Sequence, residues 1–329
     1  MFKRLIIGSA IVLIAVAASF LLMRGAKTQA VKPRIVLPGH AVRAWSAAFF
    51  PDGSRIATAG DDGVHIWDIY SGRLLHTMNY SGAHCAAVSH DGKTIAVAGG
   101  SPGLYLWNVE NGQTFTQVAR PYRSSAALSS DGQKVAAANG LPANSISIWD
   151  VKTSALLHTL HGVAEYGDRQ IQVAFSPDGT TIAAVDGSRS VKIWDVKTGA
   201  PLHTLQNPFF VAFSAAYSPD GTKLASASFD EAVWIWDVKT GALLQKFDPH
   251  QEYLHSASYL PDGKRLVSGG EKTIKIWDVK TGALLQTLHN PLGTISFIPI
   301  AVSPDGRAVA AFSNNEVLIW DINDAAPAP

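Results

Sequence analysis

The sequence repeats one dipeptide at an almost constant interval. A Trp followed by Asp or Asn occurs seven times, and successive Trp residues are 40 to 45 residues apart. The seven dipeptides are Trp67-Asp68, Trp107-Asn108, Trp149-Asp150, Trp194-Asp195, Trp236-Asp237, Trp277-Asp278 and Trp320-Asp321. A fixed period of this size indicates one supersecondary unit copied seven times, in which neighbouring copies bury each other's apolar faces.

A turn signal runs in phase with these dipeptides. An Asp-Gly pair precedes every Trp at a similar distance, as Asp52-Gly53 precedes Trp67, and in five repeats Pro stands before the Asp. Pro fixes φ at the second position of a β-turn and Gly suits the fourth, so each pair predicts a turn. The segments between turns are short and alternate in polarity, as in "SVKIWDV", and no long helical periodicity follows residue 23. This pattern predicts four strands in each repeat.

On these motifs the chain resembles the WD-repeat β-propeller family. The resemblance rests on the Asp-Gly turn, the "IWD" strand and the pair Gly39-His40 ahead of the first Asp-Gly turn. It covers residues 34–322 and implies an all-β fold, a seven-bladed β-propeller of four-stranded antiparallel blades. Ahead of the propeller we expect one N-terminal transmembrane (signal-anchor) helix.

The two ends of the repeat region predict how the ring closes. Only "INDAAPAP" follows Trp320-Asp321, which is too short and too rich in Pro for a fourth strand. A spare apolar segment, residues 34–37, precedes the first inner strand and supplies an outer strand for blade 7 in this interpretation. Residues 323–329 are expected to form a disordered tail.

The N-terminal segment, residues 1–33, differs in composition from the rest. Residues 5–23 carry no charge and follow Lys3 and Arg4; as a helix they would be about 28 Å long, close to the hydrocarbon thickness of a bilayer. Residues 1–4 are then a short tail and 24–33 a linker. We favour an uncleaved single-pass anchor over a removed signal peptide, because the run is long and lacks a good cleavage pattern.

The side of the membrane is less constrained than the anchor itself. The basic residues before the run favour a cytoplasmic N-terminus and an extracytoplasmic propeller, whereas Arg24, Lys27, Lys32 and Arg34 after it favour the reverse. We expect the extracytoplasmic arrangement, since a signal-like start usually dominates. The single Cys allows no internal disulfide and does not indicate the compartment.

Charge argues against nucleic acid as the main ligand. The whole chain carries a net charge of +1, but residues 1–34 contain six basic residues and no acidic residue. The propeller therefore has an excess of acidic residues, and no run of Lys or Arg is visible along it. We expect a monomeric propeller with a protein or peptide partner.

The repeated Trp residues are predicted to be structural, packing between blades with an acceptor for each buried indole N–H. The resemblance also implies a hydrogen-bonded set of His, Ser or Thr, Asp and Trp, for which only blade 1 carries all the pieces. That predicted set is His40, Thr58, Asp61 and Trp67. The remaining predicted structural residues are Trp149, Trp194, Trp236, Trp277 and Trp320.

The predicted innermost strands contain no Asp or Glu. A metal centre or a paired-carboxylate glycosidase site in the channel would need such residues, so we predict no metal, no cofactor and no catalytic residues. The sequence also lacks a nucleophile elbow, a phosphate loop and a His-Glu-x-x-His motif. Two alternatives stay open: a propeller-type enzyme, lactonase-like or quinone-dependent, and a structural component of the cell envelope.

Candidate binding residues lie where each innermost strand begins. The scaffold repeats there, but the side chains nine and seven residues before each turn Asp vary and include aromatic residues and Arg, which dominate protein–protein hot spots. The resemblance implies that this face binds peptides. The candidates are Arg43, Trp45, Tyr122, Arg169, Tyr253 and His255. The sequence thus predicts a membrane-tethered, non-enzymatic scaffold that binds a peptide or protein partner at the top face of its propeller.

Overall fold

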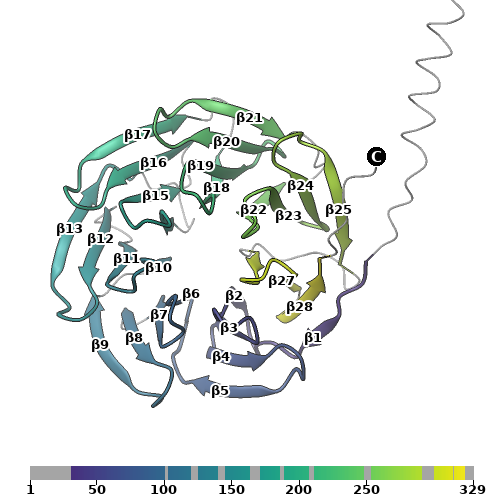
Figure 1. The fold of residues 1–329 in the computed structure, drawn as a ribbon. Helices are drawn as coiled ribbons and strands as arrows, with labels where there is room; N and C mark the ends of the chain where they lie inside the picture. Colours follow the sequence, from purple (N-terminus) through teal and green to yellow (C-terminus); the bar gives the residue numbers. More distant parts are fainter. Residues whose placement is uncertain are drawn as a thin grey trace, which may run out of the picture.

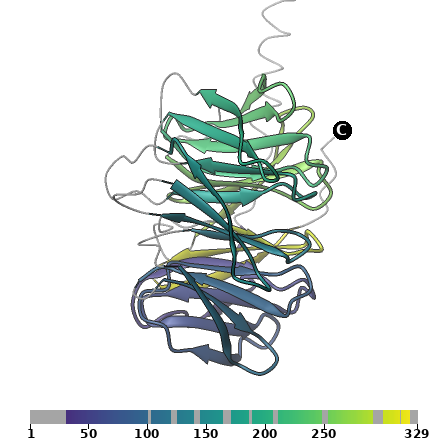
Figure 2. The same ribbon diagram turned by 90° about the vertical axis from the view of Figure 1, so that its left-hand side faces the viewer.

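The chain forms a ring of seven four-stranded antiparallel sheets in the computed structural model (Figure 1). The structure describes residues 31–100, 103–119, 125–139, 145–163, 171–185, 189–206, 211–247, 253–290, 300–313 and 315–322. Viewed from the side, the ring is a disc of stacked, twisted blades (Figure 2). The predicted all-β, seven-bladed fold is confirmed.

Each blade contributes one strand to each of four concentric positions. The innermost strands are β2 (Ala44–Phe49), β6 (Cys85–Val88), β10 (Ala126–Leu128), β14 (Gln172–Phe175), β18 (Ala212–Tyr217), β22 (Leu254–Tyr259) and β26 (Ala301–Val302). The second strands are β3 (Arg55–Gly60), β7 (Thr94–Ala98), β11 (Lys134–Asn139), β15 (Thr181–Val185), β19 (Lys223–Ser228), β23 (Arg265–Gly270) and β27 (Ala308–Ser313). The second strands are almost fully buried, because neighbouring blades cover both of their faces.

The outer half of each blade carries the repeated Trp and the free edge. The third strands are β4 (Gly63–Asp68), β8 (Leu104–Asn108), β12 (Ser145–Asp150), β16 (Ser190–Asp195), β20 (Val233–Asp237), β24 (Thr273–Asp278) and β28 (Glu316–Asp321). The outermost strands are β5 (Leu74–Met78), β9 (Thr114–Ala119), β13 (Leu156–His161), β17 (Pro201–Gln206), β21 (Leu243–Phe247), β25 (Leu284–His289) and, in blade 7, β1 (Ile35–Leu37).

The Asp-Gly pairs form the turns between the first and second strands, as predicted. In blade 5 the amide of Gly221 donates to the carbonyl of Ser218 at 2.8 Å, and Gly221 has φ of 70°, a conformation that favours Gly. The Ser218 hydroxyl donates to Asp220 at 2.6 Å. This hydrogen bond, with that from the Thr222 amide, lowers the pKa of Asp220 to about 2. The ionised carboxylate therefore stabilises the turn.

The Lys-Thr-Gly turns between the third and outermost strands also join neighbouring blades. The amide and hydroxyl of Thr198 both donate to Asp195 at 2.7 Å. The His158 ring of the preceding blade is 3.0 Å from the carbonyl of Lys197, and a Cβ at Gly199 would lie 3.1 Å from the same ring. Small turn residues thus let each outer strand pack closely on the next blade.

Hydroxyl groups join the innermost strands of neighbouring blades. The Ser214 hydroxyl of blade 5 accepts from the amide of Ala257 at 2.9 Å, and Ser256 of blade 6 accepts from the amide of Ile300 at 3.0 Å. Cys85 occupies the equivalent position in blade 2. Side chains thus satisfy edge amides that have no strand partner inside the ring.

The ring closes between the two ends of the repeat region. Strand β1 pairs antiparallel with β28, with Ile35 opposite Ile319 and Leu37 opposite Val317. Arg34 adds an ion pair to Asp321 at 3.2 Å. Leu37 is completely buried, in a core cluster shared by blades 7 and 1. The segment that precedes blade 1 therefore supplies the outer strand of blade 7, as its apolar character predicted.

The predicted anchor, residues 5–23, and the tail, residues 323–329, lie outside the described residues. Within the part that the structure describes, no helix has both the length and the apolar character needed to cross a membrane.

Candidate functional site

Those predicted binding residues that the structure describes belong to one face of the ring. We define the top face as the end at which the innermost strands begin and at which the second and third strands are joined. Arg43 and Trp45 lie at the start of β2, and Tyr253 and His255 at the start of β22. Tyr122 and Arg169 hold the equivalent position in blades 3 and 4, but both lie outside the described residues.

A polar group of top-face side chains joins blades 1 and 2. The indole N–H of Trp45 donates to Asp61 at 2.7 Å, which fixes the ring against the turn that follows β3. The Arg43 guanidinium lies 5.9 Å from the centroid of that ring, and the His84 imidazole of blade 2 lies 4.9 Å from it. The group therefore presents a cation and a held aromatic ring side by side.

An apolar group joins blades 5 and 6. The Phe229 ring lies 4.0 Å from Tyr253 and 5.4 Å from Phe213, and Phe213 in turn contacts His255 edge to face at 5.7 Å. Tyr253 is 43% exposed, whereas His255 is buried. Tyr253 is thus available to a partner, while His255 supports the rings around it. Tyr253 and His255 were both predicted as contacts, and the burial of His255 leaves only Tyr253 of the two open to solvent.

Phe229 is a top-face residue that was not among the predicted contacts. Its amide donates to the carbonyl of Val211 at 3.0 Å, just as the amide of Asp61 donates to the carbonyl of Arg43 at 2.9 Å. The two residues therefore occupy the same place in their blades, at the turn after the second strand. Phe229 could have been found by comparing these turns, as well as the innermost strands, at a fixed phase of the repeat.

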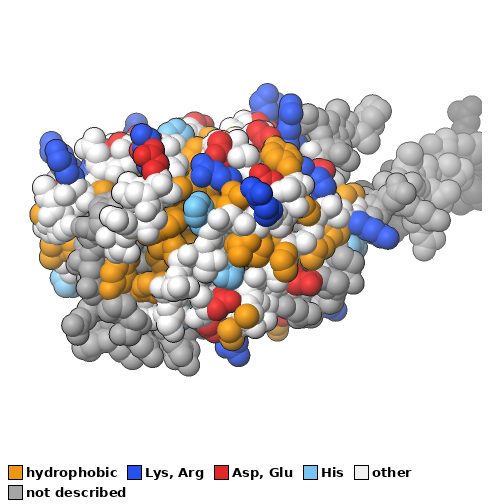
Figure 3. Space-filling view, turned by 90° about the horizontal axis from the view of Figure 1, so that it is seen from below, with side chains coloured by type: hydrophobic (Ala, Val, Ile, Leu, Met, Phe, Trp, Pro, Cys, Tyr) orange, Lys and Arg blue, Asp and Glu red, His pale blue; other side chains and the backbone are white. Residues whose placement is uncertain are grey.

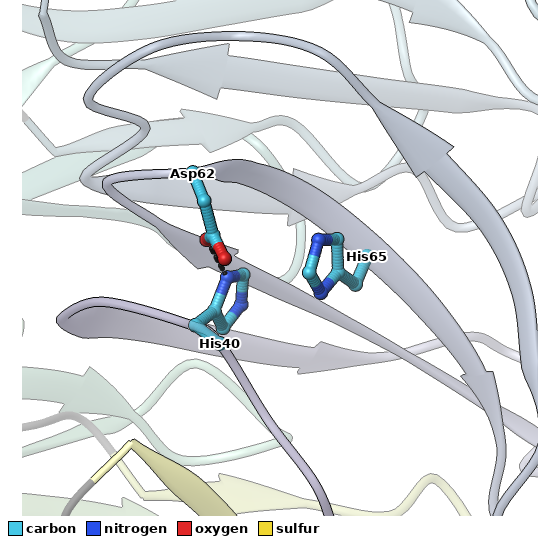
Figure 4. A group of neighbouring side chains, drawn as sticks. All are labelled: His40, Asp62 and His65. Atoms are coloured by element: carbon cyan, nitrogen blue, oxygen red, sulfur yellow. Dashed lines mark hydrogen bonds and ion pairs between the residues drawn. The ribbon is translucent and has the colours of Figure 1, made fainter.

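The predicted hydrogen-bonded set of blade 1 forms, but with Asp62 in the place predicted for Asp61. The indole of Trp67 donates to the Thr58 hydroxyl at 3.0 Å, and the Nε2 atom of His40 is 2.9 Å from the same hydroxyl. The Nδ1 atom of His40 bonds to Asp62 rather than to the predicted Asp61 (Figure 4). Asp61 instead accepts from Trp45, so the prediction for that one residue is wrong.

The length of one turn explains this correction. Ala59 pairs with Val64 in blade 1, whereas Ala227 pairs with Val233 in blade 5, so the blade 1 turn is one residue shorter. Because one residue is missing from this turn, the position found by counting back from Trp67 is Asp61, whereas the position found by counting forward from the end of β3 is Asp62.

The carboxylate of Asp62 is held in place and His40 is kept neutral. The amide of Ala41 donates to Asp62 at 2.8 Å, and the His40 ring donates to the other carboxylate oxygen. Burial lowers the pKa of His40, although the hydrogen bond to Asp62 opposes that shift. A neutral ring that donates from Nδ1 accepts at Nε2 from Thr58, which in turn accepts from Trp67, so every group has a partner.

The repeated Trp residues lie in the interior, but their indoles differ in hydrogen bonding. Trp236 donates to Ser226 at 3.0 Å and Trp277 to Ser268 at 2.7 Å. The indole N–H of Trp320 has no acceptor among the described residues. Also buried between blades are Trp107, Trp149 and Trp194.

The described parts of the innermost strands carry no carboxylate pair. One cluster of potential metal ligands does occur in the described chain, at His40, Asp62 and His65, outside those strands. The face drawn in Figure 3 shows Lys and Arg interspersed with Asp and Glu, not a single continuous basic patch. On that face, this mixture of charges offers no continuous basic surface to a polyanion.

Comparison with known proteins agrees with this architecture. The WD domain, G-beta repeat family matches residues 31–68, 156–195, 199–237 and 241–278. A search of curated proteins found no match. Propellers built from such repeats are in general protein-interaction scaffolds. The four matched repeats and the closed ring of seven blades place the chain in the WD-repeat β-propeller family.

Proposed function

We propose that this protein is a membrane-tethered, non-enzymatic scaffold that binds a peptide or protein partner at the top face of its propeller. The observation that carries the proposal is the pair of side-chain groups there: Arg43 beside Trp45 in blade 1, and the exposed Tyr253 packed at a tilt against Phe229 in blades 5 and 6. The Trp45 ring is held by its hydrogen bond to Asp61, and a ring that is already ordered loses little conformational entropy when it binds a partner.

The chemistry of the two groups suggests the character of the partner. The rings of Phe229 and Tyr253 suit an apolar side chain, and the Arg43 guanidinium suits a carboxylate or a carbonyl oxygen. Asp61 lies next to Arg43 and weakens the attraction for an acidic group at long range. We therefore expect modest affinity that falls as salt concentration rises.

The test is partner capture from membranes with matched variants of the full-length protein. Trp45→Ala and Tyr253→Ala should each cost about 1–3 kcal/mol of binding free energy if they are hot spots. Tyr70→Ala is the control, because Tyr70 is 66% exposed on a turn at the opposite face. Capture of the partner is followed by titration of the purified partner with each variant, alongside its melting curve.

Two results would refute this site assignment. Unchanged binding with both top-face variants would move the site elsewhere, and equal loss with Tyr70→Ala would show that binding is not specific to the top face. Arg169→Ala extends the series, because Arg169 holds the same phase of the repeat in blade 4. Turnover in a panel of hydrolase and oxidoreductase substrates would contradict the non-enzymatic part.

The tether is a separate part of the proposal. It rests on the uncharged run at residues 5–23 and the basic residues before it. The full-length protein should stay with membranes through carbonate and high-salt washes. Recovery of intact, uncleaved protein in the soluble fraction would refute the tether. Protease protection in intact cells would then decide the side, which we propose to be extracytoplasmic.

A further inference from the structure

A second cluster of side chains lies near the top face but outside the binding groups. His40 comes from the segment before β2, Asp62 from the turn after β3, and His65 from β4 (Figure 4). One potential ligand atom from each lies within 4.8 Å of the other two. Two imidazoles and one carboxylate form a common ligand set for Zn²⁺ and related ions.

His40 has the surroundings of a metal-binding histidine. Its Nδ1 atom faces Asp62, while its Nε2 atom is held by the Thr58 hydroxyl at 2.9 Å. Histidine ligands typically use one nitrogen for the metal and anchor the other by a hydrogen bond. Gly60 leaves space for this ring, since a Cβ there would lie 2.5 Å from the Nδ1 atom.

His65 supplies a ring nitrogen, a potential metal ligand, that the hydrogen-bonded set of blade 1 does not use. Its ring stacks on His40 with centroids 4.4 Å apart and an angle of 9° between the planes. The Nδ1 atom of His65 is buried and has no hydrogen-bond partner in the described part of the chain. A buried polar atom without a partner is costly, and a bound ion would satisfy it. The equivalent position is Lys192 in blade 4 and Lys275 in blade 6.

We infer that His40, Asp62 and His65 form a binding site for a divalent transition-metal ion, with Zn²⁺ as the ion to test. The Asp62 side chain is partly exposed, which gives the ion a path from solvent, while the His40 side chain is fully buried. A water molecule completes the coordination of such a three-ligand site. This inference is independent of the proposed partner, although Asp61, next to Asp62, holds Trp45.

Binding requires a local rearrangement that can be measured. The lone pairs of two stacked rings lie in parallel planes and do not converge on one point. The His65 ring must therefore turn until its ligating nitrogen points toward Asp62. The donors must also draw closer, because Zn–N and Zn–O distances are about 2.0–2.2 Å. When the ion takes the Nδ1 position of the neutral His40 ring, the ring proton moves to Nε2, which then donates to the Thr58 hydroxyl.

The experiment uses the full-length protein in detergent, stripped with EDTA and then dialysed. Zn²⁺ is titrated calorimetrically, and retained metal is measured by mass spectrometry after a second dialysis. We expect one Zn²⁺ per chain. His65→Phe keeps a flat ring against His40 but removes the donor, and should retain none. His76→Phe is the control, because His76 is an exposed residue of the same blade outside the cluster, and should retain one.

Melting temperatures show whether a variant has lost only the metal site or has also lost the stability of its fold. The metal-free melting temperature of His65→Phe should stay close to that of the wild type, whereas added Zn²⁺ should raise it only in the wild type. Co²⁺ offers a readout without any substitution, since nitrogen and oxygen ligands in a tetrahedral site give visible absorption bands. Equal metal retention by the wild type and His65→Phe, or absence of those bands in the wild type, would overturn the inference.

Discussion

The closing strand gives the sharpest test of how the ring is held together. Leu37 in β1 is 0% exposed and packs in a cluster with Phe312, Val317 and Trp67. Leu37→Ala removes three carbon atoms, worth about 2.4 kcal/mol at about 0.8 kcal/mol for each buried methylene. The cavity left behind raises the usual cost to about 2–5 kcal/mol. We expect a value near the lower end, because a short edge strand can move inward.

The neighbouring residue provides the control for this experiment. Val36 is 44% exposed on the other face of β1, so Val36→Ala should cost less than about 1 kcal/mol. Urea unfolding of full-length variants, followed by Trp fluorescence, measures both differences. Equal destabilisation by the two substitutions would show that β1 does not seal the core. Likewise, a chain that begins at Gly39 should melt well below one that begins at Lys32, and identical melting would contradict the closure.

Individual hydrogen bonds give three more expected outcomes. Thr58→Val should cost about 1–3 kcal/mol in urea unfolding, because it leaves both the indole N–H of Trp67 and the Nε2 atom of His40 without a partner; an unchanged midpoint would mean that the network is not stabilising. Ala311→Ser should stabilise by up to about 1 kcal/mol by offering the Trp320 indole an acceptor at the place that Thr58 holds in blade 1; a lower melting temperature would show that the hydroxyl does not fit. The depressed pKa of Asp220 stabilises the fold above its ordinary pKa of 3.8, and this contribution is lost as pH falls from about 4 through about 2. Asp220→Asn should therefore reduce the dependence of the melting temperature on pH in that range, and an equally steep curve would contradict the assignment.

The fold could be predicted from the sequence because its signals are local and repeated. An Asp-Gly turn depends on the φ that Gly adopts and on one carboxylate, as at Asp220 and Gly221. Seven such turns at a constant interval leave few alternatives to a closed ring. Even the long-range pairing of β1 with β28 was predictable, since one apolar segment was left over at one end and one strand was missing at the other.

The candidate site was predicted only where it keeps the phase of the repeat. The sequence placed Arg43, Trp45 and Tyr253 at the start of their innermost strands in this way, because each precedes its turn Asp by a fixed number of residues. Asp62 was not, because a turn one residue shorter changes which Asp reaches His40. Loop length alters geometry without altering the residue types on which a motif depends.

The sequence by itself determined the number of blades, their strand order and the segment that closes them. Only the tertiary structure decided which side chains meet at the top face. Phe229 reaches Tyr253 from a neighbouring blade, and the ring of His65 in β4 stacks on that of His40, which lies before β2. These contacts depend on the twist and stacking of whole blades, and a distance between residues that lie far apart in the chain is not encoded in any local pattern. The repeat determines the position of each side chain within its blade, whereas the packing of the blades determines which other side chains it contacts.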